Sequence, residues 1–255
     1  MMKYIEELHR LKIFHKKDVV ALSKDENAAK EILRRYKKQR LIAQVRRDLY
    51  VATDLANKVS LATKFEIAKH ITPSSCLSYH AALEYYGLAN QLYYELYISS
   101  EEVFNSFYFE GISYTFCKSK SNVGVVNPVT DPLVRITDLE RTVLDCIDRI
   151  DLSGGLEEMV GCFAIITYIN EDKLSDYLSH FNKQVLYQKT GFILSYFQKE
   201  MRLSDVFFER CKSKIGKSTR YLTDKQESDT YFKEWKLCAP QNILSFLEQG
   251  GTEYV

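Results

Sequence analysis

The sequence lacks any long apolar run. Its longest charge-free and mainly apolar stretch, residues 160–169, is far shorter than the ~20 residues that a membrane-spanning helix needs. Glu6 and Glu7 lie where a secretory signal would begin its apolar region. The composition, 45% hydrophobic and 27% charged, excludes a disordered chain, a collagen-like repeat and a coiled-coil rod. We therefore expect a soluble, globular, cytoplasmic protein without membrane contact.

Closely spaced cysteines are also missing. The 6 cysteines stand at least 16 residues apart, so no C-x-x-C pair exists to begin a zinc site or a redox motif. We expect buried, reduced thiols. These cysteines are Cys76, Cys117, Cys146, Cys162, Cys211 and Cys238.

Familiar catalytic motifs are absent. The chain has no phosphate-binding G-x-x-x-x-G-K-[ST], no G-x-G-x-x-G, no G-x-S-x-G and no H-E-x-x-H. His80 is interpreted as a helix-face residue and not as a catalytic base. We expect a protein that is not an enzyme and that has no cofactor and no metal.

The near-neutral total charge of +1 hides a strong asymmetry. Residues 1–50 hold 14 Lys+Arg against 7 Asp+Glu, whereas residues 51–255 hold 21 against 27. A basic segment of this kind favours a polyanionic partner. The function is therefore sought first in the N-terminal segment.

Residues 3–22 have the apolar spacing of two short helices separated by a break. Ser23 and Glu26 have the spacing of a capping box, which predicts a third helix that begins near Lys24. Two short β-type runs then flank Arg46-Arg47-Asp48, which predicts a hairpin with a basic tip. Three helices followed by a basic hairpin is the order of a winged helix-turn-helix.

The third helix separates its apolar and basic residues. Its apolar positions share one face, and the remaining positions are mostly Lys and Arg, which can approach base edges and phosphates in the major groove. Asn27, Lys30 and Arg34 are the candidates for base edges or nearby phosphates. The phosphate candidates are Arg35, Lys38, Arg46 and Arg47. Basic faces are also often merely solvated, and winged helices also bind proteins, so a protein-interaction scaffold stays open.

From about residue 55 the composition becomes neutral to acidic. We predict two domains: a winged helix-turn-helix over residues 1–55 and a larger α+β domain over 56–255. The second contains a small antiparallel sheet, built from runs at 93–99, 106–109 and 112–116, and a mainly helical C-terminal half. Trp235, the single tryptophan, is predicted to anchor the core.

A second capping-box pattern at residues 137–140 predicts a helix that reaches about Ile150. The helix is acidic, so Asp145 and Asp148 could bind a metal in a nucleic-acid enzyme for which the winged helix is a docking module. Arg141 and Arg149 lie at salt-bridge spacing among these acids and favour a solvated helix face instead. The metal-dependent enzyme is the alternative function.

Four segments of the chain carry a family resemblance: VRRDLYV at 45–51, SYHAALEYYGL at 78–88, ITDLERTVLD at 136–145 and TGFIL at 190–194. Together they resemble the AbiEi antitoxin family of abortive-infection systems. The family's wing turn commonly has Gly where this chain has Asp48. Because Asp adopts left-handed conformations less readily than Gly, the turn is expected to be reshaped.

The resemblance implies a function that composition and periodicity do not by themselves indicate. Members of the family are transcriptional regulators paired with a nucleotidyltransferase toxin. The resemblance implies a repressor that binds inverted repeats in its own promoter, on double-stranded DNA, through the winged helix. It also implies a C-terminal domain that counteracts the toxin, usually without a stable complex between the two proteins.

Overall fold

A computed structural model of the chain describes residues 4–119, 121–223, 228, 230–245 and 247. The fold is mixed α and β with several small sheets. Contacts divide the chain into two compact units, and each unit is built from segments that are not contiguous in the sequence. Unit 1 comprises residues 1–77, 94–120 and 127–135. Unit 2 comprises residues 78–93, 121–126 and 136–255. The predicted domain boundary at residues 55/56 lies inside unit 1. Among the described residues, none of the helices combines the length and the apolar character of a bilayer crossing.

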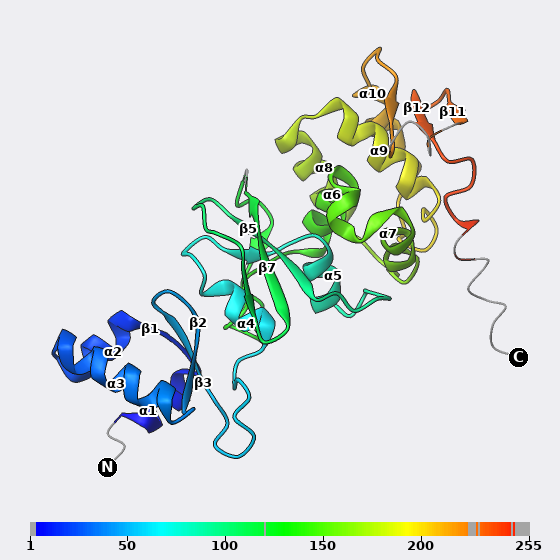
Figure 1. The fold of residues 1–255 in the computed structure, drawn as a ribbon. Coiled ribbons are helices and arrows are strands. Elements are labelled where there is room, and N and C mark those ends of the chain that lie inside the picture. The colour runs from blue at the N-terminus through cyan, green and yellow to red at the C-terminus, as the bar shows by residue number, and fades with distance from the viewer. Residues whose placement is uncertain (1–3, 120, 224–227, 229, 246, 248–255) are drawn as a thin grey trace, which may run out of the picture. The chain divides into compact units, whose positions relative to one another are not determined.

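Unit 1 begins with three helices and a small sheet, drawn in blue in Figure 1. The three strands take the order β1-β3-β2, with both pairs antiparallel. Leu8, Phe14, Val19, Leu33 and Tyr36 are fully or almost fully buried between the helices and this sheet. The elements are α1 (Ile5–Leu11), β1 (Ile13–His15), α2 (Lys16–Ser23), α3 (Glu26–Lys38), β2 (Ile42–Arg46) and β3 (Leu49–Ala52).

Two sequence predictions for this segment need correction. The capping box at Ser23 and Glu26 is wrong: Ser23 is the last residue of α2, and Asp25 is the N-cap of α3, where its side chain accepts a hydrogen bond of 2.5 Å from the backbone N–H of Ala28. Either residue type can cap a helix, and the left-handed Lys24 (φ 59°) decides which one does, because it ends α2. Strand β1 was also missed, because three residues are too few to show a period.

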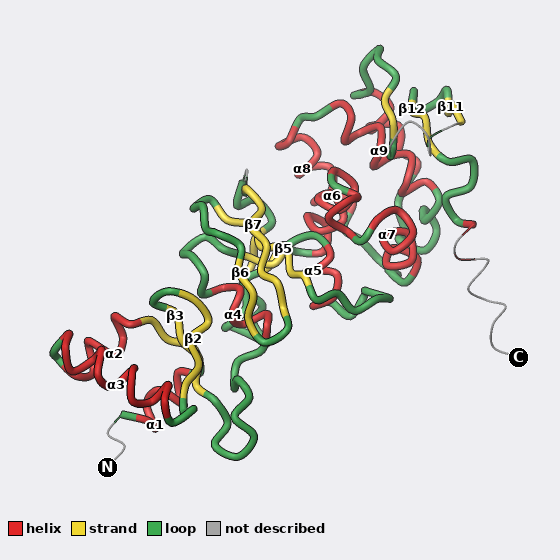
Figure 2. Tube along the Cα trace, in the orientation of Figure 1, coloured by secondary structure: helices red, strands yellow, loops and turns green. Residues whose placement is uncertain are grey.

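The rest of unit 1 contains a second group of strands. In this group β6, β7, β5 and β4 are successive neighbours, and Figure 2 shows β6, β7 and β5 side by side. Glu110 and Gly111 both have positive φ, as a tight two-residue hairpin between β6 and β7 requires. The elements are α4 (Lys64–Lys69), β4 (Cys76–Leu77), β5 (Glu95–Ser100), β6 (Phe107–Phe109) and β7 (Ile112–Lys118).

The prediction of a wholly antiparallel sheet is wrong. β5 and β7 are parallel, with Glu95 opposite Ser113 and Ser100 opposite Lys118. The chain leaves β5, forms β6 and returns through the hairpin, so β7 runs in the same direction as β5 and lies between β5 and β6. Apolar alternation along single strands contains no information on this order of neighbours.

Unit 2 is largely helical, as predicted, but ends in a sheet that the sequence did not predict. In that sheet β12 pairs with β10 in parallel and with β11 antiparallel. The elements are α5 (His80–Tyr85), β8 (Val125–Val126), β9 (Ile136–Thr137), α6 (Leu139–Asp148), the 3₁₀ helix η1 (Ile150–Ser153), α7 (Gly155–Ala164), α8 (Glu171–Phe181), α9 (Gln184–Ser195), α10 (Asp205–Ser213), β10 (Arg220–Tyr221), β11 (Thr230–Phe232) and β12 (Leu237–Ala239).

The core of unit 2 confirms the prediction for Trp235, which is only 5% exposed. Its ring lies 6.4 Å from that of Phe208 and directly over Gly191, where a Cβ would fall 2.1 Å from the indole. The helix predicted from the second capping box exists as α6. Its N-cap is Asp138 and not Thr137, and the helix ends at Asp148, before the predicted Ile150.

His80 is buried and does not lie on a solvent-exposed helix face. Its Nε2 lies 3.0 Å from Oε1 of Glu158, and both side chains are 2% exposed. The backbone N–H groups of Asn90 and Gln91 donate to the same carboxylate oxygen. Glu158 thus joins α5, α7 and the loop after α5 inside unit 2, which is a structural role that no local pattern predicts.

Candidate nucleic-acid interface

Helix α3 buries one side and exposes the other because its apolar residues recur at helical spacing. Ala29, Leu33 and Tyr36 are 0–4% exposed. The five predicted contact residues on α3 all lie on the exposed side. At about 100° per residue they occupy an arc of about 140° around the helix axis, opposite the buried stripe. They are Asn27, Lys30, Arg34, Arg35 and Lys38.

Two acidic residues lie among these cations. Nζ of Lys30 is 3.4 Å from Oε1 of Glu26, and Nζ of Lys16 on α2 donates to the same oxygen over 2.8 Å. The hydrogen bond from Lys16, and then that from Lys30, holds the pKa of Glu26 below its ordinary value. Arg34 in turn donates to Glu31, which raises the pKa of Arg34. The two ion pairs within α3 are Lys30–Glu26 and Arg34–Glu31, and each of these four side chains is more than half exposed. Their charges therefore stay accessible to a partner.

The turn between β2 and β3 presents one of its two predicted arginines to solvent. The side chain of Arg47 is 95% exposed. Asp48 has φ 62°, the left-handed conformation for which Gly is otherwise preferred, and a register shift between Gln44 and Arg46 accompanies the turn. The backbone N–H of Lys16 donates to the carbonyl of Asp48 over 3.0 Å, which ties the turn to the start of α2.

Arg46 faces a different environment from Arg47. Its guanidinium carbon lies 5.5 Å from the ring centroid of Phe104 and 5.3 Å from that of Phe107, within the range of a cation–π contact. Burial lowers the pKa of Arg46, and its Nη1 is buried without a hydrogen-bond partner. The sequence grouped Arg46 with Arg47 as tip residues, whereas the structure separates them.

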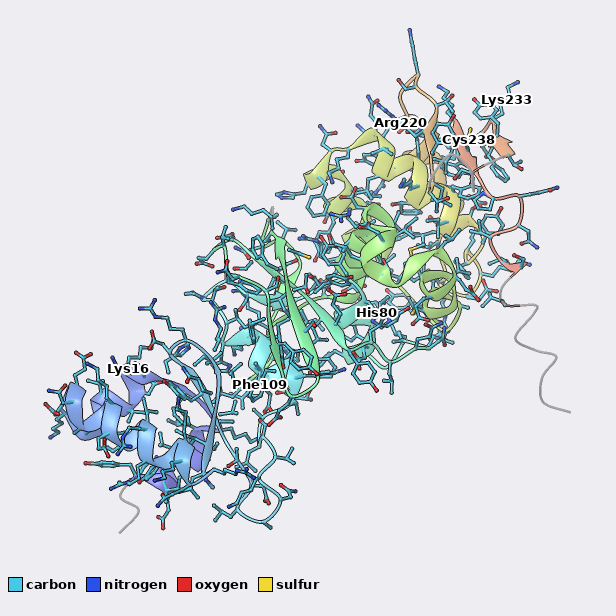
Figure 3. All side chains as sticks on the ribbon, in the orientation of Figure 1. Lys16, His80, Phe109, Arg220, Lys233 and Cys238 are labelled. Atoms are coloured by element: carbon cyan, nitrogen blue, oxygen red, sulfur yellow. The ribbon has the colours of Figure 1, made fainter. Side chains whose placement is uncertain are left out.

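Two residues near this face were not among the sequence candidates. Lys16 lines a small cavity of about 440 Å³ with His15, Glu26 and Asp48, where α2, α3 and the hairpin turn meet. Figure 3 labels Lys16 in this part of unit 1. Glu31 lies on the exposed side of α3, and its spacing of three residues from Arg34 was the signal that could have found it.

The acids proposed for the alternative metal site are engaged in ion pairs. Asp145 accepts a hydrogen bond of 2.8 Å from Nε of Arg141, and Asp148 accepts one from Nζ of Lys183. Burial raises the pKa of Asp145 to about 6, with Arg141 acting in the opposite direction. Within the described part of the chain, no group of three His, Cys, Asp or Glu side chains could hold a metal ion.

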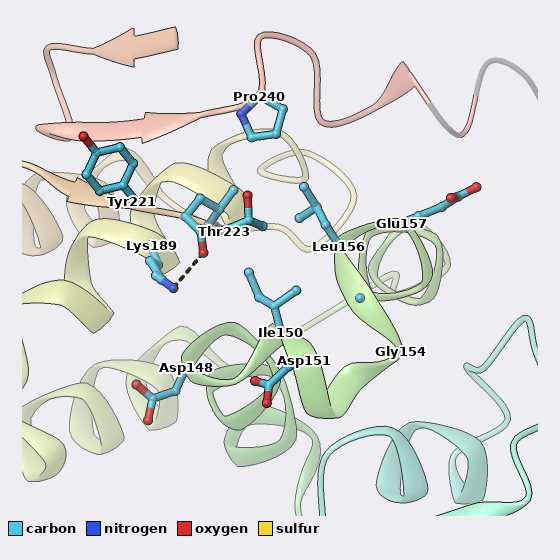
Figure 4. Close-up of a pocket in the computed structure, with 12 residues that line it drawn as sticks. Asp148, Ile150, Asp151, Gly154, Leu156, Glu157, Lys189, Tyr221, Thr223 and Pro240 are labelled. Carbon is cyan, nitrogen blue, oxygen red and sulfur yellow. Dashed lines mark hydrogen bonds between the residues drawn. The ribbon is translucent and has the colours of Figure 1, made fainter. Parts of the chain in front are cut away.

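Unit 2 has a larger cavity of about 860 Å³ beside η1, between the start of α7 and the end of β10 (Figure 4). Among the described residues that line it, Lys189 is the one cation, and burial lowers the pKa of this side chain. Its Nζ donates to the carbonyl of Leu222 over 2.8 Å. Asp148 and Asp151 also line the cavity, where their negative charges disfavour an anionic ligand.

Comparison with known proteins yields a fold and no named family. No family model matches the sequence, and no curated protein matches it. The structure is similar to the crystal structure of RV2827C protein from Mycobacterium tuberculosis, with a TM-score of 0.67 and 11% sequence identity. The match covers 98% of this chain and 94% of that chain, so the likeness extends over both units.

Proposed function

We propose that residues 1–55 form a winged helix-turn-helix that binds double-stranded DNA. One observation carries the proposal: the order α1-β1-α2-α3-β2-β3, with a β1-β3-β2 sheet, leaves the basic side of α3 exposed near the exposed Arg47 of the β2–β3 turn. In this reading α3 is the recognition helix and the β2–β3 turn is the wing.

The energetic basis of binding is neutralisation of phosphates. Each Lys or Arg that contacts a phosphate releases condensed counterions, so affinity falls as the salt concentration rises. Lys30, Arg34, Arg35, Lys38 and Arg47 are exposed and can reach a polyanion without rearrangement. Asn27, which has no charge, contributes base readout, because an Asn amide can donate to and accept from adenine.

We further propose that the protein is an antitoxin and autorepressor. Its resemblance to the AbiEi family supports this assignment: the chain would repress its own operon by binding promoter inverted repeats and would counteract a nucleotidyltransferase toxin. The likeness to RV2827C protein supports the arrangement of the fold only. The proposal involves no catalytic residue and no cofactor.

The decisive experiment is a gel-shift titration of the purified protein against its own upstream DNA and a scrambled duplex, at two salt concentrations. We expect tighter, salt-sensitive binding to the upstream DNA. Equal binding to both duplexes, or no binding to either, would refute the proposal that the protein regulates its own promoter. Incubation of the same duplexes with magnesium or manganese tests the enzyme alternative, which requires cleavage.

The antitoxin role is tested separately by co-expression with a nucleotidyltransferase encoded beside the gene. We expect the full chain to restore growth. If the protein binds DNA but does not restore growth, the antitoxin role is refuted and the regulatory role stands.

A further inference from the structure

Glu31 is an acidic residue inside the basic face of α3. It lies about 40° around the helix from Asn27 and one turn after it, which is in the N-terminal half of the helix. Its side chain is 57% exposed. Phosphates repel a carboxylate, and the guanidinium of Arg34 beside Glu31 offsets that repulsion. The pair can therefore approach DNA together, with the carboxylate available to accept a hydrogen bond from a base.

The geometry of Glu31 and Arg34 leaves hydrogen-bonding groups available. Nε and Nη2 of Arg34 donate to the two carboxylate oxygens of Glu31, over 2.9 Å and 2.8 Å. A guanidinium has five N–H groups, so donors remain on Nη1 and Nη2, at the end of the side chain. Each carboxylate oxygen also has a further lone pair. The hydrogen bond from Arg34 holds the pKa of Glu31 below its ordinary value. Glu31 is a carboxylate at neutral pH, as an ordinary Glu is, and can only accept hydrogen bonds.

This set of donors and acceptors matches one base pair. In the major groove, guanine presents two acceptors, O6 and N7, and cytosine presents the N4 amino donor. We propose that Glu31 and Arg34 act together to select a G·C pair, with Arg34 donating to guanine and Glu31 accepting from cytosine. Glu31 would thus be a specificity-determining residue. The inference rests on the proposed DNA binding and adds the identity of a base pair to it.

The test begins with selection of bound duplexes from a randomised pool by the full-length protein. The dissociation constant is then measured for the best duplex and for every single base-pair substitution of it. The wild type is compared with Glu31→Gln and Arg34→Lys. Glu6→Gln is the matched control, because Glu6 is an exposed acid of α1 that does not lie on α3. Circular dichroism checks that each variant is folded.

We expect one position at which the wild type prefers G·C by about tenfold or more, as a good bidentate contact provides. Glu31→Gln and Arg34→Lys should both lose discrimination at that same position, while Glu6→Gln keeps it. If Glu31→Gln changes affinity equally for all duplexes, Glu31 contributes only its negative charge to binding and reads no base, and the inference is wrong. The same holds if the wild type binds DNA without a G·C preference. If the wild type does not bind DNA at all, the proposed function itself fails.

Discussion

The contrast between Arg46 and Arg47 gives a sharp test of the proposed wing. Arg47 is 95% exposed at the β2–β3 turn, whereas Arg46 lies over Phe104 and Phe107. We expect Arg47→Ala to remove one phosphate contact, which lowers the slope of log affinity against log salt by about 0.9. At about 0.15 M salt that loss corresponds to about fivefold weaker binding.

Arg46→Ala should act on stability instead. Loss of a cation–π contact costs about 0.5–2 kcal/mol, depending on how far the cation is desolvated, and would lower the melting temperature by several degrees. The salt slope should stay near that of the wild type. Fluorescence anisotropy with a labelled duplex between 50 and 200 mM salt, together with thermal unfolding, measures both quantities for both variants.

The outcome that refutes this reasoning is specific. If Arg46→Ala lowers the salt slope as much as Arg47→Ala and leaves the melting temperature unchanged, the guanidinium of Arg46 lies on DNA and not on the aromatic rings. If neither variant changes the slope, the turn is not a wing that tracks phosphates. An Arg47→Lys variant serves as the control, because it keeps the charge at the turn.

Three further predictions concern unit 2. Gly191→Ala should destabilise the protein by about 1–3 kcal/mol in denaturant unfolding, because its Cβ would lie 2.1 Å from the Trp235 ring; an unchanged midpoint would contradict this packing. Asp138→Ala should cost about 1–2 kcal/mol, since Asp138 caps α6 and also accepts a hydrogen bond from Tyr177, whereas Asp138→Asn should retain most of the cap; equal losses would argue against capping. The pKa of Asp145 is raised to about 6, so the folded state binds the proton of this carboxyl group more tightly than the unfolded state does. The contribution of Asp145 to the free energy of unfolding should therefore fall as the pH rises from about 4 to 6. Asp145→Asn should abolish that trend, and a variant with the same pH profile as the wild type would contradict this prediction.

Much of the helical framework could be predicted because its causes are local. The stripe of Ala29, Leu33 and Tyr36 recurs at helical spacing, and the cations fill the remaining positions of the same helix. Gly87, with φ 71°, follows α5 and takes the left-handed conformation that commonly ends a helix at a glycine. Local signals were less reliable for exact ends, since neighbouring residues such as Ser23 and Asp25 compete for the same role as N-cap.

The features of the candidate site likewise fall into those that the sequence determined and those that only the tertiary structure decided. By itself, the sequence determined that the N-terminal segment is basic and that α3 is amphipathic, because charge and periodicity are properties of neighbouring residues. Only the tertiary structure decided that Arg46 turns toward Phe104 and Phe107, that β5 and β7 run parallel, and that His80 pairs with Glu158. These contacts join residues that are between 18 and 78 positions apart in the chain. Many pairings of such distant residues are compatible with one local pattern, and only packing of the whole core selects among them.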